Sequence, residues 1–135
     1  MNTLFGDSFF FVAYLNPKEA VHDRAVEYLT RSPDRIVTTS WVLAEVGNFL
    51  AEYPSRRLFI PLVRQLRSEP RIRILPASDK TFNQGLELYG RRRDKRWSVT
   101  DCISFVVMQD EGITEALTGD HHFEQAGFTI LLKAA

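Results

Sequence analysis

The chain has 135 residues, 44% of them hydrophobic and 25% charged, which excludes a disordered chain and predicts one globular domain over residues 1–135. Seventeen basic residues balance seventeen acidic ones, so any polyanion has to be bound by a local basic patch rather than by net charge. One cysteine, no bilayer-length apolar run and no recognisable signal peptide lead us to expect a cytoplasmic protein that is not bound to a membrane.

In chain order, short apolar runs alternate with stretches of helical periodicity. For the first half we expect strands at residues 3–6 and 35–38, and helices over 9–15, from Asn16-Pro17 to Leu29, and from a Thr39 or Ser40 cap to Leu50. For the second half we expect strands at 71–75, 116–118 and 128–132, and helices from Pro54-Ser55 to Leu66, from Ser78 to about Arg92, and from a Ser98 cap to Gly112.

Strands that alternate with helices predict an α/β fold, here a three-layer α/β/α sandwich with a largely parallel central sheet. In such sheets the functional site lies beyond the carboxyl ends of the strands. The position of polar residues relative to those ends is therefore the main guide to function.

Four acidic residues are candidates for one site at that edge. Asp7 follows the first predicted strand and Asp120 follows the strand at 116–118, while Asp101 lies in the first turn after Ser98 and Glu45 about two turns into its helix. Each has a purely structural alternative: Asp7 as a helix cap, Asp101 as a first-turn acid, Asp120 as a turn residue and Glu45 as a solvated helix residue.

Their joint placement favours a shared role. Asp7 and Asp101 border apolar sequence, where a carboxylate needs a partner. Carboxylates gathered within a few ångströms repel one another unless a cation neutralises them, and all-oxygen ligands suit Mg²⁺ or Mn²⁺. Such ions neutralise a phosphodiester and activate water, so no protein nucleophile is required.

A basic run, with Trp97 directly behind it, precedes Asp101. Its members are Arg91, Arg92, Arg93, Lys95 and Arg96. They are candidates for binding phosphates beside the acids, with Trp97 stacking on a base; the alternative is a solvated loop with a buried tryptophan. His121 and His122 could contact a nucleic acid, but we expect them to bind nothing, because hard-cation chemistry does not need imidazole. We expect Cys102 to be a core residue.

Four segments carry a resemblance to a known family along the whole chain: Asp7 near the N-terminus, residues 39–46 (TSWVLAEV), residues 97–102 (WSVTDC) and residues 116–123 (ALTGDHHF). With these segments the chain resembles the PIN-domain nucleases, most closely the VapC-type toxin ribonucleases.

The resemblance implies a metal-dependent endoribonuclease that cleaves single-stranded RNA with Mg²⁺ or Mn²⁺. It implies catalytic roles for Asp7, Glu45, Asp101 and Asp120, with the three aspartates as metal ligands. Ser98 and Thr100 would support the site by hydrogen bonding. Many members are toxins silenced by a small antitoxin protein, and many are homodimers, so both partners are expected here.

One position departs from the family pattern. The N-terminal motif often has a serine or threonine two residues after the aspartate, whereas here Phe9 stands there and Ser8 carries the hydroxyl. This departure keeps open a second hypothesis, a catalytically inactive RNA- or partner-binding module. The same Phe9 argues against a haloacid-type phosphatase, which needs a second aspartate there, and Lys133 lies too late for a receiver domain.

Overall fold

The computed structural model describes residues 1–52 and 54–134, and within them five strands form a single sheet. The strands are β1 (Thr3–Gly6), β2 (Arg35–Thr39), β3 (Ile72–Leu75), β4 (Glu115–Leu117) and β5 (Thr129–Ile130). Their spatial order is β3-β2-β1-β4-β5, and all four neighbouring pairs are parallel. The predicted α/β fold with a parallel central sheet is confirmed.

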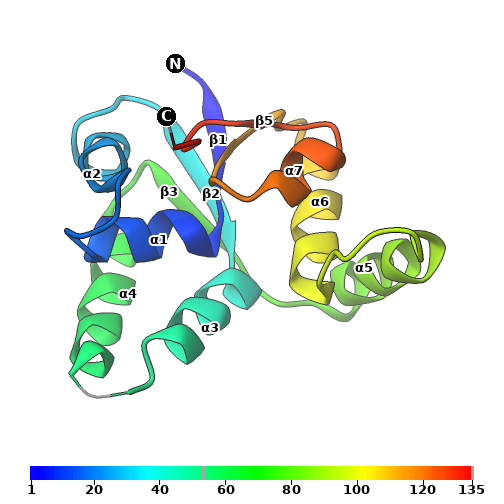
Figure 1. Ribbon diagram of the computed structural model, residues 1–135, viewed down its shortest axis with the longest axis horizontal. Helices are drawn as coiled ribbons and strands as arrows, with labels where there is room; N and C mark the ends of the chain where they lie inside the picture. Colours follow the sequence, from blue (N-terminus) through cyan, green and yellow to red (C-terminus); the bar gives the residue numbers. More distant parts are fainter. Residues whose placement is uncertain (53, 135) are drawn as a thin grey trace.

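The same described residues form seven α-helices and one short 3₁₀ helix, η1 (Ser55–Leu58). The α-helices are α1 (Ser8–Leu15), α2 (His22–Thr30), α3 (Ser40–Phe49), α4 (Phe59–Ser68), α5 (Asp79–Arg91), α6 (Val99–Glu111) and α7 (His121–Gln125). Figure 1 shows α1, α2 and α4 on one side of the sheet and α5, α6 and α7 on the other, which gives three layers.

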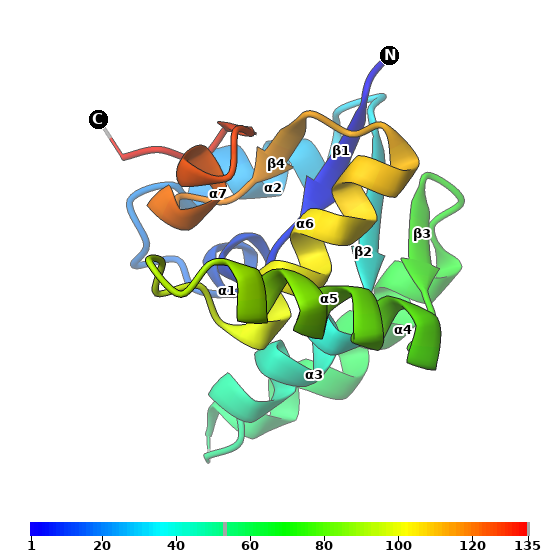
Figure 2. The same ribbon diagram turned by 90° about the vertical axis from the view of Figure 1, so that its right-hand side faces the viewer.

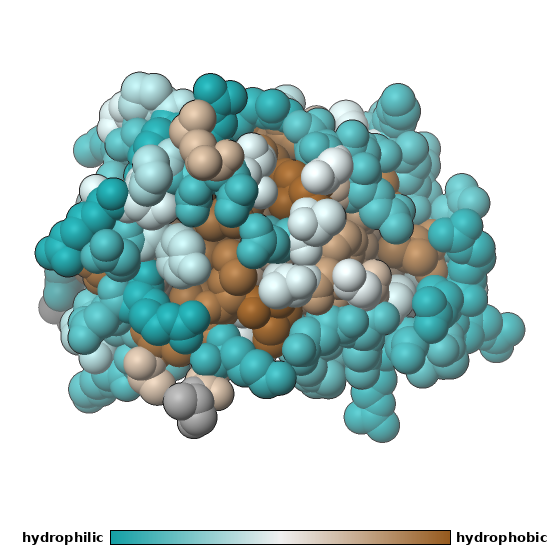
Figure 3. All heavy atoms as spheres, turned by 90° about the horizontal axis from the view of Figure 1, so that it is seen from above, coloured by the Kyte–Doolittle hydropathy of each residue, from teal (hydrophilic) through white to brown (hydrophobic). Residues whose placement is uncertain are grey.

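The strand order places a topological switch point beside β1. From β1 the chain adds β2 and β3 in one direction, and it later returns to add β4 and β5 on the other side of β1. Ligands of parallel sheets bind at the carboxyl ends of strands where the order reverses. Asp7 directly follows β1, and Asp120 lies three residues after β4. The opposite edge, seen from above in Figure 3, is hydrophilic around a central apolar band.

Helix α5 packs on α6 rather than on the sheet, as Figure 2 shows. Gly85 makes this close crossing possible, because a Cβ atom there would lie 2.5 Å from Ile103 Cγ1 and 3.3 Å from the Ile103 backbone. Helix α6 itself is well defined at both ends: Ser98 caps its start and Gly112, with φ of 69°, ends it. This packing fixes the N-terminus of α6, where Asp101 lies.

One predicted helix start is wrong, and one short helix was not predicted. Asn16-Pro17 does not begin a helix: the Asn16 side chain accepts a bond from the Lys18 N–H, and Glu19 N–H and His22 N–H bond back three residues, so consecutive turns precede α2. The short helix α7 was not predicted, because five residues are too few to show a helical period. Pro54-Ser55 opens η1, from which α4 continues.

Across residues 1–52 and 54–134, no helix has both the length and the apolar character that a bilayer crossing requires.

Candidate functional site

Asp7 is the most deeply buried acid at the switch point, with 4% of its surface exposed. It occupies the cap position of α1, yet its side chain makes no capping hydrogen bond. Instead, Thr118 Oγ1 donates to Asp7 Oδ2 at 2.8 Å, and the Asp120 N–H donates to the same Oγ1 at 3.1 Å. The capping alternative for Asp7 is therefore wrong, and Thr118 ties the end of β1 to the segment that follows β4.

The surroundings of Asp7 disfavour its negative charge. Burial raises the pKa of Asp7 from its ordinary value of 3.8 to about 7, although hydrogen bonds from Thr118 and the Ser8 backbone oppose the shift. The nearby charges of Asp101 and Glu45 raise the pKa further. A bound cation would offset the free-energy cost of burying the Asp7 charge and would screen its repulsion by Asp101 and Glu45. This group of carboxylates therefore suits a hard divalent ion.

Glu45 reaches this group from α3 and is held by Ser8. The Ser8 hydroxyl donates to Glu45 Oε1 at 2.5 Å, from a position directly after Asp7. Ser8 precedes Phe9, the residue that departs from the family motif, and its hydroxyl contacts Glu45. The ring of Phe9 approaches Gly119 on the opposite part of this site, where an added Cβ would lie 2.7 Å from Phe9 Cζ.

Asp101 and Asp120 are linked through a histidine. Asp101 Oδ2 accepts from the Ser98 N–H at 3.1 Å, within a capping box, and lies 3.0 Å from His122 Nδ1. That same Nδ1 is 3.6 Å from Asp120 Oδ1. The structural alternative for Asp101 holds as well, because Asp101 completes the capping box. Asp120 also has a structural role, but as the cap of α7, where it accepts from the His122 N–H, rather than as the predicted turn residue.

A cleft of about 530 Å³ opens over these acids. Asp7, Glu45 and Asp120 line it together with an acid not anticipated from the sequence, Glu19, while Phe9, Val12 and Phe49 form apolar parts of its wall. Asp101 is not part of this lining, but it lies close enough to Asp7 to raise the pKa of that carboxyl. The four predicted acids are thus brought to one edge of the sheet.

Ser98 and Thr100, the two residues predicted to support the site, differ in their contacts. Ser98 contacts Asp101 through both its hydroxyl and its N–H. Within residues 1–52 and 54–134 the Thr100 side chain makes no hydrogen bond, and Thr118 instead supports Asp7. No role was predicted for Thr118, and His122 was expected to bind nothing, whereas its Nδ1 contacts Asp101. A threonine at the end of a buried strand beside Asp120 was the available sequence indication.

Most of the basic run lines a separate cleft of about 360 Å³. The cleft is lined by Arg92, Arg93, Lys95 and Arg96 of the run, together with Tyr89, Trp97 and Cys102. Arg91 instead pairs with Glu87, and Arg92 bonds Asp94, which lowers the pKa of that carboxyl. Within the described part of the chain, no ion pair is found for Arg93 or Arg96.

Trp97 does not offer an open ring. It is 5% exposed, its Nε1 donates to Gln125 Oε1, Phe105 packs edge-on against it and the Arg92 guanidinium lies 5.1 Å from its ring centroid. The buried alternative is therefore the correct one, and base stacking on Trp97 is wrong. Cys102 is fully buried as predicted, and burial raises the pKa of its thiol to about 11.

Comparison with known proteins places this geometry in a family context. The PIN domain model matches residues 5–129. The 23S rRNA-specific endonuclease VapC20 of Mycobacterium tuberculosis is 27% identical over 125 residues, which span 93% of this chain and 95% of that protein.

Solved structures agree with this. The crystal structure of M. tuberculosis VapC20, described as a Sarcin-Ricin loop cleaving toxin, superposes with a TM-score of 0.83 at 27% identity, covering 93% of this chain and 96% of that one. VapBC2 from Rickettsia felis, bound to a promoter DNA fragment, shares the fold with a TM-score of 0.68 at 16% identity, covering 97% and 98%. The resemblance drawn from the motifs is confirmed, and the chain belongs to the PIN domain family.

Proposed function

We propose that this protein is a metal-dependent endoribonuclease that cleaves single-stranded RNA and acts as the toxin of a toxin–antitoxin pair. The observation that carries the proposal is the gathering of Asp7, Glu45, Asp101 and Asp120 at the switch point, with a buried Asp7 whose pKa is raised to about 7. A lone structural carboxylate has no need of three further acids around it, whereas a cation site does.

In this proposal Asp7, Asp101 and Asp120 hold Mg²⁺ or Mn²⁺, and Glu45 acts as the fourth acid. When bound, the ion supplies charge neutralisation at the phosphate and activates water. Thr118 holds Asp7 Oδ2 and so fixes the orientation of that carboxylate. Ser8 orients Glu45, and the Ser98 capping box orients Asp101.

The basic run supplies the RNA contact in this proposal. Arg93, Lys95 and Arg96 are the principal phosphate-binding residues. Arg91 and Arg92 lie 3.6 and 3.0 Å from Glu87 and Asp94, whereas Lys95 Nζ is 4.0 Å from Asp94 Oδ2 and can be drawn away by a phosphate. All five residues lie in or beside the loop that leads into α6, so a strand held there is close to Asp101. VapC20 is named as specific for 23S rRNA, and ribosomal RNA is accordingly the first substrate class to test.

The proposed site is tested by cleavage of single-stranded RNA by the purified protein. We expect cleavage with Mg²⁺ or Mn²⁺, loss of cleavage with EDTA, and a loss of at least about a hundredfold in Asp7→Asn and Asp101→Asn. RNA binding without cleavage under every metal condition would instead favour the inactive binding module, and cleavage by Asp101→Asn at the normal rate would contradict the assigned ligands.

The proposed cellular role includes a cytoplasmic location, a homodimer and a small antitoxin. Supporting surface exists on α3 and α4. Ile60 is 56% exposed and lines a groove of about 350 Å³, and Phe49 is 72% exposed at the wall of the cleft over the acids. Exposed apolar surface of this kind suits a protein partner. Induction in cells should arrest growth, and Asp101→Asn should relieve the arrest. Light scattering that shows a strict monomer at high concentration would contradict the homodimer.

A further inference from the structure

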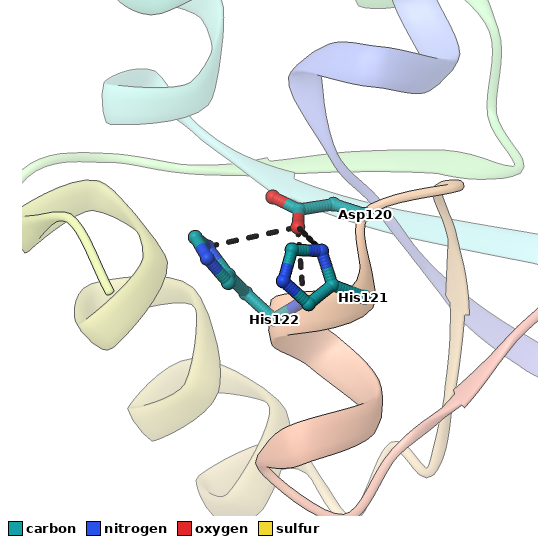
Figure 4. Close-up of side chains that lie close together, drawn as sticks. All are labelled: Asp120, His121 and His122. Atoms are coloured by element: carbon teal, nitrogen blue, oxygen red, sulfur yellow. Dashed lines mark hydrogen bonds and ion pairs between the residues drawn. The ribbon is translucent and has the colours of Figure 1, made fainter. Parts of the chain in front are cut away.

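Two histidine rings converge on one carboxylate oxygen at the start of α7. His121 Nδ1 lies 3.7 Å and His122 Nδ1 lies 3.6 Å from Asp120 Oδ1, and the possible ligand atoms of the three residues all lie within 4.8 Å of one another. Figure 4 shows the two rings on either side of the carboxylate, with their centroids 4.6 Å apart and their planes tilted by 54°.

These separations match those of ligands around one small ion. A tetrahedral site with metal–ligand bonds of about 2.1 Å has ligand atoms about 3.4 Å apart, and the two measured nitrogen–oxygen separations exceed this by only 0.2–0.3 Å. The two histidines stand within 4.8 Å of each other at their ligand atoms, so their rings have to turn toward a common point to hold an ion. Two imidazole nitrogens and one carboxylate oxygen suit a borderline transition metal such as Zn²⁺ better than Mg²⁺.

The solvent exposure of the three side chains is also compatible with a metal site. The His121 side chain is 71% exposed, whereas those of Asp120 and His122 are 32% and 21% exposed. An ion can reach the site from solvent, and a water molecule can fill the fourth position, as in zinc sites with three protein ligands.

We propose that Asp120, His121 and His122 form a second metal site, which takes Zn²⁺ or a similar transition metal. It shares Asp120 with the oxygen-only group of Asp7, Glu45, Asp101 and Asp120 and differs from that group in its two histidine ligands. This goes beyond the proposed nuclease function and does not require it. The two sites meet at His122, because its Nδ1 lies 3.0 Å from Asp101 Oδ2. A nitrogen that ligates zinc cannot also donate to that oxygen, so zinc binding releases Asp101 from His122.

The test measures Zn²⁺ binding directly, by calorimetry in the presence of excess Mg²⁺ and by NMR of the histidine ring nitrogens. The chain has three histidines, and His22 is an internal reference because its Nδ1 lies 2.8 Å from the Ala13 carbonyl oxygen on another part of the fold. We expect one equivalent of Zn²⁺ to bind and to shift the Nδ1 resonances of His121 and His122, while those of His22 stay in place.

Variants identify the ligands. His121→Ala and His122→Ala should each weaken zinc binding at least about tenfold, since even residues that only support a ligand contribute that much. Glu124→Gln, an exposed carboxylate on the same helix, is the matched control and should bind zinc normally. Because His121 is largely exposed, its replacement leaves the fold intact and keeps the test decisive.

A third variant separates the two sites. Asp7→Asn, which alters the oxygen-only group, should retain zinc binding within about threefold, well below the tenfold effect of a lost ligand. Zinc binding that is abolished by Asp7→Asn and unaffected by His121→Ala would place the ion among the oxygen ligands and overturn the proposal. Unshifted His121 and His122 resonances at saturating zinc would also overturn it. Since binding rather than cleavage is read, a protein without nuclease activity gives the same answer.

Discussion

Thr118 Oγ1 donates a hydrogen bond of 2.8 Å to Asp7 Oδ2 and so joins two residues that are 111 positions apart. The same oxygen accepts from the Asp120 N–H. One hydroxyl therefore sets the spacing between the strand end that carries Asp7 and the loop that carries Asp120. It also favours the charged form of Asp7, because its hydrogen bond lowers the pKa of that carboxyl.

Replacing Thr118 by valine removes this hydroxyl with little change in shape. The pKa of Asp7 should rise further, so a metal ion has to displace a more tightly held proton. We expect metal affinity to fall about tenfold, the equivalent of one hydrogen bond to a charged group, and the pH profile of cleavage to move to higher pH. Thr118→Ser, which keeps the hydroxyl, is the control. Overlapping profiles of the valine variant and the natural protein would contradict this role.

Asp7→Asn should have opposite effects on stability with and without metal. The pKa of Asp7 is 3.8 in the unfolded chain and about 7 in the folded protein. Between pH 3.8 and about 7, the folded protein therefore keeps the Asp7 proton, whereas the unfolded chain loses it. Without metal, the free energy of unfolding therefore falls as pH rises through this window, by on the order of 4 kcal/mol in total. Asparagine stays neutral, so the variant should be more stable than the natural protein at pH 8 in EDTA and similar at pH 4.

Thermal unfolding at both pH values, with EDTA and with Mg²⁺, checks this prediction. Mg²⁺ should stabilise the natural protein at pH 8 and leave Asp7→Asn unchanged, because the ion no longer meets the buried charge. Equal melting temperatures of the two metal-free proteins at pH 8 would show that burial does not penalise the charge of Asp7.

Ser8→Ala should weaken catalysis by freeing Glu45. The Ser8 hydroxyl holds Glu45 Oε1 at 2.5 Å, and a glutamate released from this contact samples other rotamers. We expect cleavage at saturating metal to fall about tenfold, consistent with the loss of one charge-assisted hydrogen bond. Ser8→Thr should restore most of it. If Ser8→Ala cleaves at the natural rate while Glu45→Gln does not, Glu45 does not depend on Ser8.

The basic run should govern how RNA binding responds to salt. Replacing Arg93, Lys95 and Arg96 by glutamine should reduce the slope of log affinity against log salt concentration by about 2, if each residue neutralises one phosphate of a single strand. The measurement uses an Asp101→Asn background to prevent cleavage. Arg64→Gln with Arg67→Gln on α4 is the control for general charge, and an equal reduction by that pair would refute a dedicated binding edge.

Two glycines of α5 offer a matched pair for the packing that positions α6. Gly85→Ala should destabilise the protein by about 1–3 kcal/mol, because its Cβ would lie 2.5 Å from Ile103 Cγ1. No atom lies within 4 Å of the Cβ position at Gly90, so Gly90→Ala should be neutral or stabilise by up to about 1 kcal/mol. Denaturant unfolding compares them, and equal effects would show that the crossing at Gly85 is not tight.

Much of the fold could be predicted from the sequence, since strong signals mark its elements. The cap at Ser98 and the stop at Gly112 give the bounds of α6, and apolar runs between turns give the strands. The failures have local causes. Asn16-Pro17 is compatible with a helix start and with a turn, and only the bonds made by Asn16 decide between them. Helix α7 is too short to show a period.

The site was predictable in membership but not in its connections. The strand-end positions of Asp7 and Asp120 follow from topology, so their common edge could be inferred. Thr118, Ser8 and His122 act through contacts with residues distant in sequence, which a single chain pattern does not encode. The burial of the Trp97 side chain also depends on tertiary packing. Trp97 follows an exposed loop, but it packs against Phe105 and donates a hydrogen bond to Gln125.

The order of the strands has a consequence for the protein during its synthesis. Strand β1 is made first, but its neighbour β4 comes near the end of the chain. A ribosome-bound chain that ends before residue 118 contains Asp7 without the hydroxyl that holds it and without Asp120. Chains of this length therefore lack the assembled group of acids, and the proposed activity begins only after β4 and the segment that carries Asp120 have left the ribosome.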